Sequence, residues 1–287
     1  MTVLDVHRHL WPETLLVELR ARDAPPYLRD WTLILHDGAY PVEPDAYGPE
    51  RLLADLDRSG VDVAVVSCPP TLGFDRLPDR EASALADAYH EGTRAAITAA
   101  GGRVRAFALG RVEDGFAGVT VAAESLLDLD GLAPLLDEVE RAGGVLFVHP
   151  GVASGRRHPP WWPAIVDYTA QMQAAYAAWL GEGVDRWPSL RVLFAILAGG
   201  APIQLERFAS RGFDVKRALA PTIYLDTASY GRRALELCLS TYGGGRLVFG
   251  SDGPVLDPST SLAPVQSFGQ AVEDALCRDN PRELFTW

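Results

Sequence analysis

The sequence predicts an α/β protein in which eight strands and the helices between them close into one (β/α)₈ barrel, a TIM barrel. Short apolar runs rich in β-branched residues alternate with amphipathic stretches, and this alternation is typical of parallel strands covered by helices. The apolar runs number eight, which favours a closed barrel over an open sheet. The chain has 287 residues, a length at which such barrels commonly form a single domain.

The predicted strands and helices follow one another along the chain. The strands are Val3–His9, Val61–Ser67, Val104–Leu109, Gly118–Ala122, Val145–His149, Val192–Leu197, Ile223–Thr227 and Leu247–Asp252. Amphipathic helices are predicted at Pro49–Arg58, Arg80–Ala99, Leu132–Ala142, Trp162–Gly181 and Arg232–Leu239.

Two connections between these elements are long. Residues 10–48 follow the first strand, are rich in Pro, Asp and Trp, and are predicted to form a cap or lid. Residues 151–163 follow the fifth strand. Both leave from carboxyl ends of strands, where barrel enzymes build their active sites. Since no shift in composition marks a second domain, we expect one domain over residues 1–287 with a cap inserted at 10–48.

Composition limits the partners and the location of the protein. Hydrophobic residues make up 48% and charged residues 22% of the chain, and no apolar run reaches the roughly 18 residues that cross a bilayer. The opening MTVLDVHRHLW lacks the pattern of a signal peptide, so a cytoplasmic location is expected. A net charge of −12 argues against nucleic acid or a membrane as the main partner. We expect a small-molecule substrate as the partner. A homodimer is one possible assembly.

Four side chains that can bind a metal end three of the predicted strands. The first strand ends in His7-Arg8-His9, and strand alternation turns both histidines into the barrel. Alone, this pair is a weak signal, because two hydrogen-bonded polar residues near a strand end give the same pattern. The fifth strand, however, ends on His149 and the eighth on Asp252. Three imidazoles and a carboxylate suit one divalent ion, first Zn²⁺, with Mn²⁺, Fe²⁺ or Co²⁺ as alternatives.

Longer segments carry the pattern of a known family. They are DVHRHLWP, PERLLADLDRSGVDVAVVS, LLDEVERAGGVLFVHPG, RWPSLRVLFAILAGGAP, YLDTASYG, RLVFGSDGP and NPRELF. In these the chain resembles the amidohydrolase-related branch of the amidohydrolase superfamily that contains aminocarboxymuconate-semialdehyde decarboxylase. The resemblance implies that His7, His9, His149 and Asp252 bind one catalytic metal. Binuclear amidohydrolases usually bridge their metals with a lysine on the fourth strand, whereas the only lysine here, Lys216, follows the sixth.

The sequence departs from the resembled family at the sixth strand. Relatives end that strand on a histidine that orients or deprotonates the metal-bound water, and Ile196 stands at this position. An alkyl side chain can do neither. Three interpretations stay open. Asp252 accepts the proton instead, His158 reaches in from the loop after the fifth strand, or the protein binds a ligand without converting it.

The two long connections supply candidate substrate contacts. Arg156 and Arg157 match the geometry of a clamp on a substrate carboxylate, although two solvated loop cations would look the same. Trp11 and Trp161 suit the roof of a pocket for a flat or cyclic substrate, or they pack the cap onto the barrel. Asp226, at the end of the seventh strand, either orients a ligand histidine or binds local backbone.

The function that these residues predict first is hydrolysis of a small cyclic amide or lactone by a water that the metal activates, with Asp252 carrying the proton. Hydrolysis ranks first because it needs the fewest groups beyond the metal, the water and one carboxylate. The alternative is non-oxidative decarboxylation of a carboxylated ring or an unsaturated acid. A second alternative is a ligand-binding barrel that has lost catalysis at Ile196. Fold alone does not choose among them.

Overall fold

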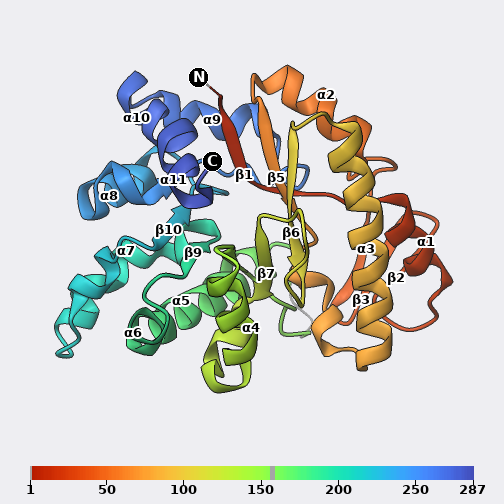
Figure 1. Cartoon of the computed structure of the whole chain (residues 1–287), viewed down its shortest axis with the longest axis horizontal. Coiled ribbons are helices and arrows are strands. Elements are labelled where there is room, and N and C mark those ends of the chain that lie inside the picture. Colours follow the sequence, from red (N-terminus) through yellow and green to blue (C-terminus); the bar gives the residue numbers. More distant parts are fainter. Residues whose placement is uncertain (1, 156–158) are drawn as a thin grey trace.

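The structure, a computed structural model, describes residues 2–155 and 159–287. At its centre is an eight-stranded sheet in the order β1-β5-β6-β7-β8-β9-β10-β11, in which neighbouring strands run parallel. Helices lie around these strands (Figure 1). The strands are β1 (Leu4–His9), β5 (Val63–Ser67), β6 (Val104–Leu109), β7 (Gly118–Ala122), β8 (Val145–His149), β9 (Arg191–Phe194), β10 (Ile223–Asp226) and β11 (Leu247–Val248).

The two edges of this sheet meet and nearly close it into a barrel. The segment that continues β11 runs beside β1, where Asp252 N donates a hydrogen bond to His7 O at 2.9 Å. One step further, His9 N donates to Gly253 O at 2.8 Å. The predicted TIM barrel is therefore confirmed.

The cap segment has secondary structure of its own. It contains α1 (Glu13–Ala21) and an antiparallel sheet of β2 (Tyr27–Arg29), β3 (Thr32–Leu35) and β4 (Gly38–Pro41). Figure 1 shows α1 and these strands beside α3 (Asp79–Ala99). The hydroxyl of Thr14 donates to Ala88 O on α3 at 2.5 Å and so fastens the cap to the barrel wall. The role of residues 10–48 as a lid over the site remains a prediction.

The helices that the sequence predicts are all observed, four of them with bounds within three residues. The helix Ile196–Ala209, the short helix Val184–Arg186 and the helices after Tyr242 were not predicted. The first predicted helix, α2, has Pro49 in its first turn and ends against Gly60 in the left-handed conformation, two standard helix signals. None of the helices among residues 2–155 and 159–287 is both long and apolar enough to span a membrane. The set is α2 (Pro49–Ser59), α4 (Leu129–Arg141), α5 (Tyr168–Ala178), α6 (Val184–Arg186), α7 (Ile196–Ala209), α8 (Arg232–Tyr242), α9 (Pro258–Gln266), α10 (Gln270–Asp274) and α11 (Asn280–Phe285).

Two strands end three or four residues before their predicted carboxyl ends. β9 ends at Phe194 rather than at Leu197, because residues 196–200 leave the extended conformation for positive φ angles of 45° to 91°. β11 ends at Val248 rather than at Asp252, because the residues beyond it bond to β1 in an irregular pattern. Both early ends lie at the carboxyl end of the barrel, so the departures from regular structure fall where a site is expected.

An aromatic layer closes the barrel interior next to this end. Phe147 is fully buried two residues before His149 on β8, and its ring stacks on Phe107 with centroids 4.9 Å apart. The same ring meets His7 edge to face at 5.0 Å. Burying a large aromatic ring stabilises the fold by roughly 1.5–3 kcal/mol. This layer gives the histidines a rigid apolar base.

A buried histidine on α3 predicts how stability changes with pH. Nε2 of His90 accepts a hydrogen bond from Leu109 N at 2.9 Å, so the ring is neutral there. Burial lowers the pKa of His90 from 6.5 to about 4, and the charge of Glu113 offsets only part of this. The unfolded chain therefore takes up a proton first as the pH falls. We expect the free energy of unfolding to drop between pH 6.5 and pH 4 by up to about 3 kcal/mol.

Denaturant unfolding across that pH range measures this effect. In His90→Gln the amide oxygen can still accept from Leu109 N, but it does not titrate, so the difference in unfolding free energy between the wild type and this variant should change with pH. A constant difference from pH 7 to pH 4 would contradict the assignment.

Candidate active site

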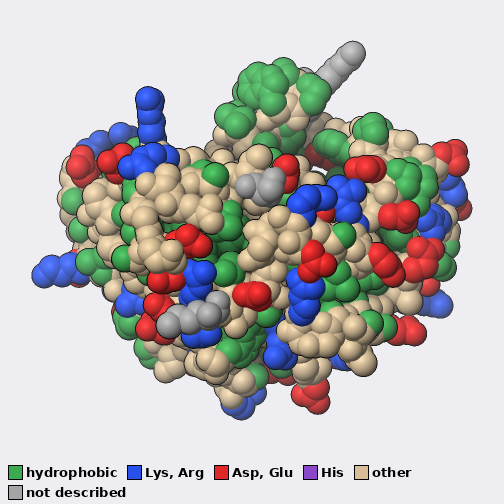
Figure 2. All heavy atoms as spheres, turned by 90° about the horizontal axis from the view of Figure 1, so that it is seen from above, with side chains coloured by type: hydrophobic (Ala, Val, Ile, Leu, Met, Phe, Trp, Pro, Cys, Tyr) green, Lys and Arg blue, Asp and Glu red, His purple; other side chains and the backbone are tan. Residues whose placement is uncertain are grey.

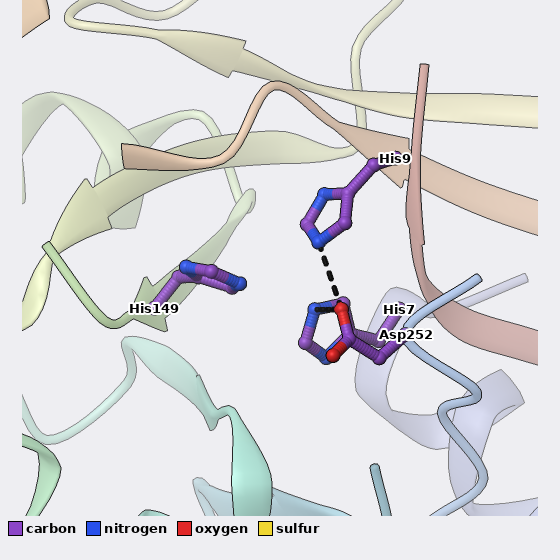
Figure 3. A group of neighbouring side chains, drawn as sticks. All are labelled: His7, His9, His149 and Asp252. Atoms are coloured by element: carbon purple, nitrogen blue, oxygen red, sulfur yellow. Dashed lines mark hydrogen bonds and ion pairs between the residues drawn. The ribbon is translucent and has the colours of Figure 1, made fainter. Parts of the chain in front are cut away.

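The four predicted metal ligands converge at the carboxyl end of the barrel. His7 and His9 come from β1, His149 ends β8, and Asp252 lies in the segment after β11. One ligand atom from each lies within 4.8 Å of the ligand atoms of the others. Figure 3 shows His149 facing the other three side chains across the centre. The histidines are buried, and the carboxylate side chain is 15% exposed.

Asp226 sets the orientation of the His7 ring. Its Oδ2 lies 2.8 Å from His7 Nδ1, so this nitrogen carries the proton and donates it to the carboxylate. In the neutral ring that a metal ligand requires, Nε2 is an unprotonated acceptor. It is buried, lies 3.5 Å from Asp252 Oδ1 and has no hydrogen-bond partner among the described residues. A buried nitrogen lone pair of this kind fits a metal ion.

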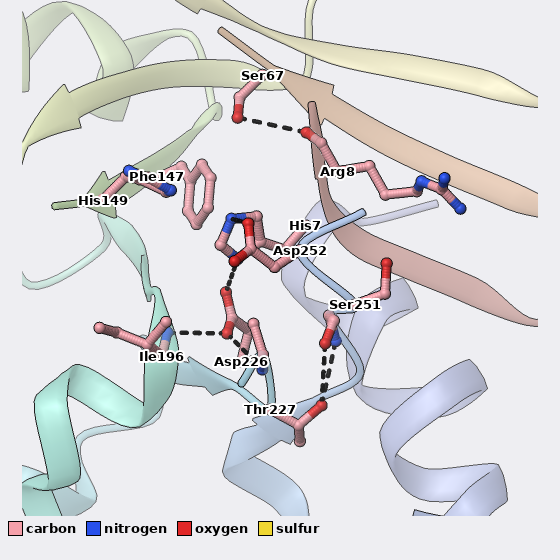
Figure 4. A network of polar contacts seen from close by, with 12 residues as sticks. His7, Arg8, Ser67, Phe147, His149, Ile196, Asp226, Thr227, Ser251 and Asp252 are labelled. Carbon is pink, nitrogen blue, oxygen red and sulfur yellow. Dashed lines mark hydrogen bonds and ion pairs between the residues drawn. The ribbon is translucent and has the colours of Figure 1, made fainter. Parts of the chain in front are cut away.

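Asp226 also binds local backbone, so both interpretations of this residue from the sequence hold at once. Its other oxygen, Oδ1, accepts from Ile196 N at 2.9 Å and from Ala228 N at 3.0 Å (Figure 4). The carboxylate therefore joins the ends of β9 and β10 to the first ligand on β1.

The other two imidazoles are held in a similar way. Nδ1 of His149 donates to Pro150 O at 2.9 Å, which leaves its Nε2 as an acceptor. Nδ1 of His9 lies 3.4 Å from Ser67 O, and its Nε2 lies 3.0 Å from Asp252 Oδ1. A carbonyl or carboxylate behind each ring fixes the tautomer that a metal ligand needs.

Burial and the neighbouring charges prevent the three rings from being protonated together. Burial opposes charge on His7, but nearby carboxylates, Asp226 first, outweigh it and raise the pKa of His7 to about 9. Burial, and then the charges of His7 and His9, hold the pKa of His149 well below its usual value. Burial opposes charge on Asp252 too, yet the three histidines lower its pKa overall. A cation between these groups satisfies them all.

Asp5 supports the site, and the sequence analysis did not single it out. This fully buried carboxylate accepts from Ser251 Oγ at 2.6 Å and from Ser251 N at 3.0 Å. It ties β1 to the residue before Asp252 and so positions ligands from both ends of the chain. The signal in the sequence was its place two residues before His7, on the same inward face of the strand.

The strand-six position holds a left-handed turn. Residues 196–200 all have positive φ, and the first three, Ile196, Leu197 and Ala198, are not glycine. Such residues cost about 1–2 kcal/mol each in this conformation. A Cβ on Gly199 would come within 2.3 Å of Thr169 O, so α5 packs directly on the turn. The backbone of Ile196 thus takes part in the site through Asp226, although its side chain offers no proton-transfer group.

Of the substrate contacts predicted in the long loops, Trp11 and Trp161 fall within the described residues. Arg156, Arg157 and His158 lie outside the described residues. The Trp161 side chain is 56% exposed. Trp11 is buried and stacks on Tyr47, with ring centroids 3.8 Å apart. The substrate-binding and catalytic roles given to these five residues from the sequence remain predictions.

Two phenols near Asp252 were missed in the sequence. The negative charge of Asp252 acts on the hydroxyl of Tyr47 in the cap and on that of Tyr168 at the start of α5. Burial first, and then that charge, raise the pKa of Tyr47 to about 12, so it is a neutral hydrogen-bond donor. Nothing in the spacing of either tyrosine points to the site, because both reach it through long connections.

The fold and the site define a class of protein: a TIM-barrel enzyme with a three-histidine, one-aspartate site for a divalent metal ion. A family model described as Amidohydrolase matches residues 4–287, and the chain belongs to this family, as its sequence predicted.

The charged side chains on the face of the molecule drawn in Figure 2 are of both signs and interspersed.

Named relatives include decarboxylases. The 2-amino-3-carboxymuconate-6-semialdehyde decarboxylase of Dictyostelium discoideum is 23% identical over 85% of this chain and 78% of its own. The crystal structure of Metarhizium anisopliae IDCase shares the fold with a TM-score of 0.85 at 20% identity, over 99% of this chain and 97% of that one. A 5-carboxyvanillate decarboxylase of Novosphingobium aromaticivorans, solved with bound manganese, has a TM-score of 0.79 at 16% identity, over 100% and 97%.

Proposed function

We propose that this protein is a metal-dependent, non-oxidative decarboxylase of an aromatic or unsaturated carboxylic acid. The observation that carries the metal dependence is the convergence of three imidazole nitrogens and one carboxylate within 4.8 Å at the carboxyl end of the barrel. Three nitrogens and one oxygen bind a divalent ion and leave further coordination positions for a substrate.

Decarboxylation replaces hydrolysis as the first choice. The sequence ranked hydrolysis of a cyclic amide or lactone first because it needs few groups, but that is an argument about economy alone. The relative from Dictyostelium discoideum and the structural neighbour from Novosphingobium aromaticivorans are both named decarboxylases. The donor set here suits either reaction, so these relatives favour the alternative.

The reaction replaces a carboxyl group by a proton. The carbon–carbon bond to the carboxylate breaks, carbon dioxide leaves, and the bonding electrons stay on the ring carbon, which takes up one proton. When bound, a divalent ion supplies a Lewis acid that holds the anionic substrate and stabilises negative charge developing during the reaction. Asp252 is the carboxylate at the centre and is partly exposed, so we assign to it the transfer of the proton.

This assignment selects one of three interpretations of Ile196. Asp252 carries the proton, and the backbone of Ile196 keeps Asp226 and His7 in place. A histidine at position 196 is then not required. The metal we propose is Mn²⁺, with Zn²⁺ as the alternative, because the manganese-bound neighbour has this fold. The homodimer and the cytoplasmic location are kept as further predictions.

The proposal is tested with the purified full-length protein and a panel of hydroxylated benzoic acids, unsaturated dicarboxylic acids, lactones and cyclic amides. We expect carbon dioxide release from at least one carboxylic acid, its loss after chelation, and its return with Mn²⁺ or Zn²⁺. Elemental analysis of the protein as purified identifies the ion. Hydrolysis of a lactone or an amide without carbon dioxide release would restore the first interpretation. Tight binding of a carboxylic acid without any turnover would favour a ligand-binding barrel.

A further inference from the structure

A cavity that none of the four metal ligands lines lies beside the cap. It has a volume of about 480 Å³ and is enclosed by the cap, the start of α2 and one face of α3. Figure 1 shows α1, α2 and α3 on the same side of the barrel. None of His7, His9, His149 and Asp252 is among the residues that line it. Its volume lies within the range of pockets that hold small organic ligands, about 300–1,000 Å³.

Small residues on α3 leave the room for this cavity, and close contacts hold its walls. Gly92, Ala95, Ala96, Ala99 and Ala100 line it with the spacing of a single helix face. A Cβ on Gly92 would come within 2.4 Å of the Pro12 ring and of the Thr14 hydroxyl, so the start of α1 lies directly on α3. The cavity is therefore part of the folded structure and needs no rearrangement to exist.

Aromatic rings form the cap side of the cavity. Trp11, Trp31 and Tyr47 line it, and the Trp11–Tyr47 pair is stacked with an angle of 6° between the rings. Backbone bonds brace both parts of this wall: Trp11 N donates to Tyr47 O at 2.9 Å, and Val42 N donates to Trp31 O at 2.8 Å. The indole nitrogen of Trp11 is buried and has no hydrogen-bond partner among residues 2–155 and 159–287.

The charged residues around the cavity are acidic. Glu13, Glu43, Asp45 and Glu50 line it, and the part of it built from described residues includes no lysine, arginine or histidine. Glu13 pairs with Arg20 at 2.7 Å, and Glu43 lies 3.8 Å from Arg51. Within the described residues, Asp45 and Glu50 form no salt bridge. Two carboxylates at the rim thus remain without a cation.

We propose that this cavity binds a small organic cation, an ammonium group on an aromatic or alkyl body. Aromatic rings attract a cation and cover its apolar part, and Trp31 already does so for Arg20, whose Cζ lies 5.1 Å from the ring centroid. The carboxylates at the rim supply the opposite charge. The alanine face of α3 leaves space for the body of the ligand. None of the four metal ligands lines this cavity, although Tyr47 is near Asp252, so the binding test does not require the proposed decarboxylation.

Calorimetric titration of the full-length protein tests this proposal. The probes are 2-phenylethylammonium, the neutral 2-phenylethanol and the anionic 3-phenylpropanoate, which share a ring and a two-carbon linker. We expect the cation to bind at least about tenfold more tightly than the alcohol, the anion not to bind, and added salt to weaken only the cation. Glu50→Gln should lower the affinity for the cation and leave that for the alcohol unchanged.

Two matched substitutions on α3 locate the site. Ala99 is exposed and lines the cavity, whereas Ala84 is also exposed on the same helix and does not line it. Ala99→Trp should fill the space and abolish binding, and Ala84→Trp should bind as the wild type does. If Ala99→Trp does not fold, Ala95→Trp replaces it, since Ala95 is also an exposed residue of this wall. Equal affinity for cation and alcohol, no binding of the cation to the wild type, or undiminished binding to the blocked variant would overturn the proposal.

Discussion

Asp252→Asn is expected to lower turnover by at least about 100-fold, or roughly 2.7 kcal/mol of transition-state stabilisation, while the protein still binds metal. Asparagine keeps the shape of the side chain and one oxygen toward the histidines, but it cannot hold and release a proton. Asp252 Oδ1 lies 3.0 Å from His9 Nε2 and 3.5 Å from His7 Nε2, so the carboxylate is already in place as a fourth ligand. Three imidazoles remain in the variant to bind the ion.

The measurement separates loss of metal from loss of proton transfer. Turnover is assayed at saturating metal, and metal content is determined on the same sample. Asp114→Asn is the matched control, because Asp114 is an exposed aspartate in the loop between β6 and β7. Full turnover by Asp252→Asn with a full complement of metal would remove Asp252 from the proton-transfer role and leave it a ligand only.

The convergence of the four candidate metal ligands was predictable from the sequence because it depends on local rules. Strand alternation puts His7 and His9 on one face, and the carboxyl ends of parallel strands meet at one end of a barrel. These rules place His149 and Asp252 near them without any knowledge of tertiary contacts. The prediction holds even though β11 ends at Val248, because the backbone bond from Asp252 N to His7 O brings the segment back to β1.

The surroundings of the ligands were not predictable, because they depend on contacts between distant residues. The run from Val192 to Leu197 is apolar and β-branched, so it indicates a strand throughout. In the structure Asp226, 30 residues further on, accepts from Ile196 N and holds the start of a left-handed turn there. Tyr47 likewise stacks on Trp11, 36 positions earlier in the chain, and the charge of Asp252, far away in sequence, acts on its hydroxyl. The periodicity of a single segment does not predict contacts between residues that are so far apart in the sequence.

The second large effect is expected from Asp226→Asn, which should weaken metal binding about 10- to 100-fold without unfolding the protein. Asp226 Oδ1 accepts two backbone N–H groups, from Ile196 and Ala228, and Oδ2 accepts the proton of His7 Nδ1. In the variant the amide oxygen keeps the two backbone bonds, because the opposite orientation would lose both. The amide nitrogen then faces His7 and donates to its Nδ1.

A donor at that position reverses the tautomer of His7. The ring proton moves to Nε2, the atom that faces the other ligands, and a protonated nitrogen cannot bind a metal. We therefore expect competition with a chelator to show the weaker affinity. Nitrogen chemical shifts of His7 in the metal-free protein, recorded above pH 9 where the wild-type ring is neutral, should show the exchanged tautomer. Thermal unfolding of the metal-free variant should stay within a few degrees of the wild type, since a loss of about 1 kcal/mol moves Tm by roughly 2–4 °C in a domain of this size.

Asp226→Ala is the comparison, because it leaves the two buried N–H groups without an acceptor and should lower stability by about 2–4 kcal/mol. Metal affinity unchanged in Asp226→Asn would mean that the carboxylate serves the backbone alone, and that His7 takes its orientation from the packing of Phe147 beneath it.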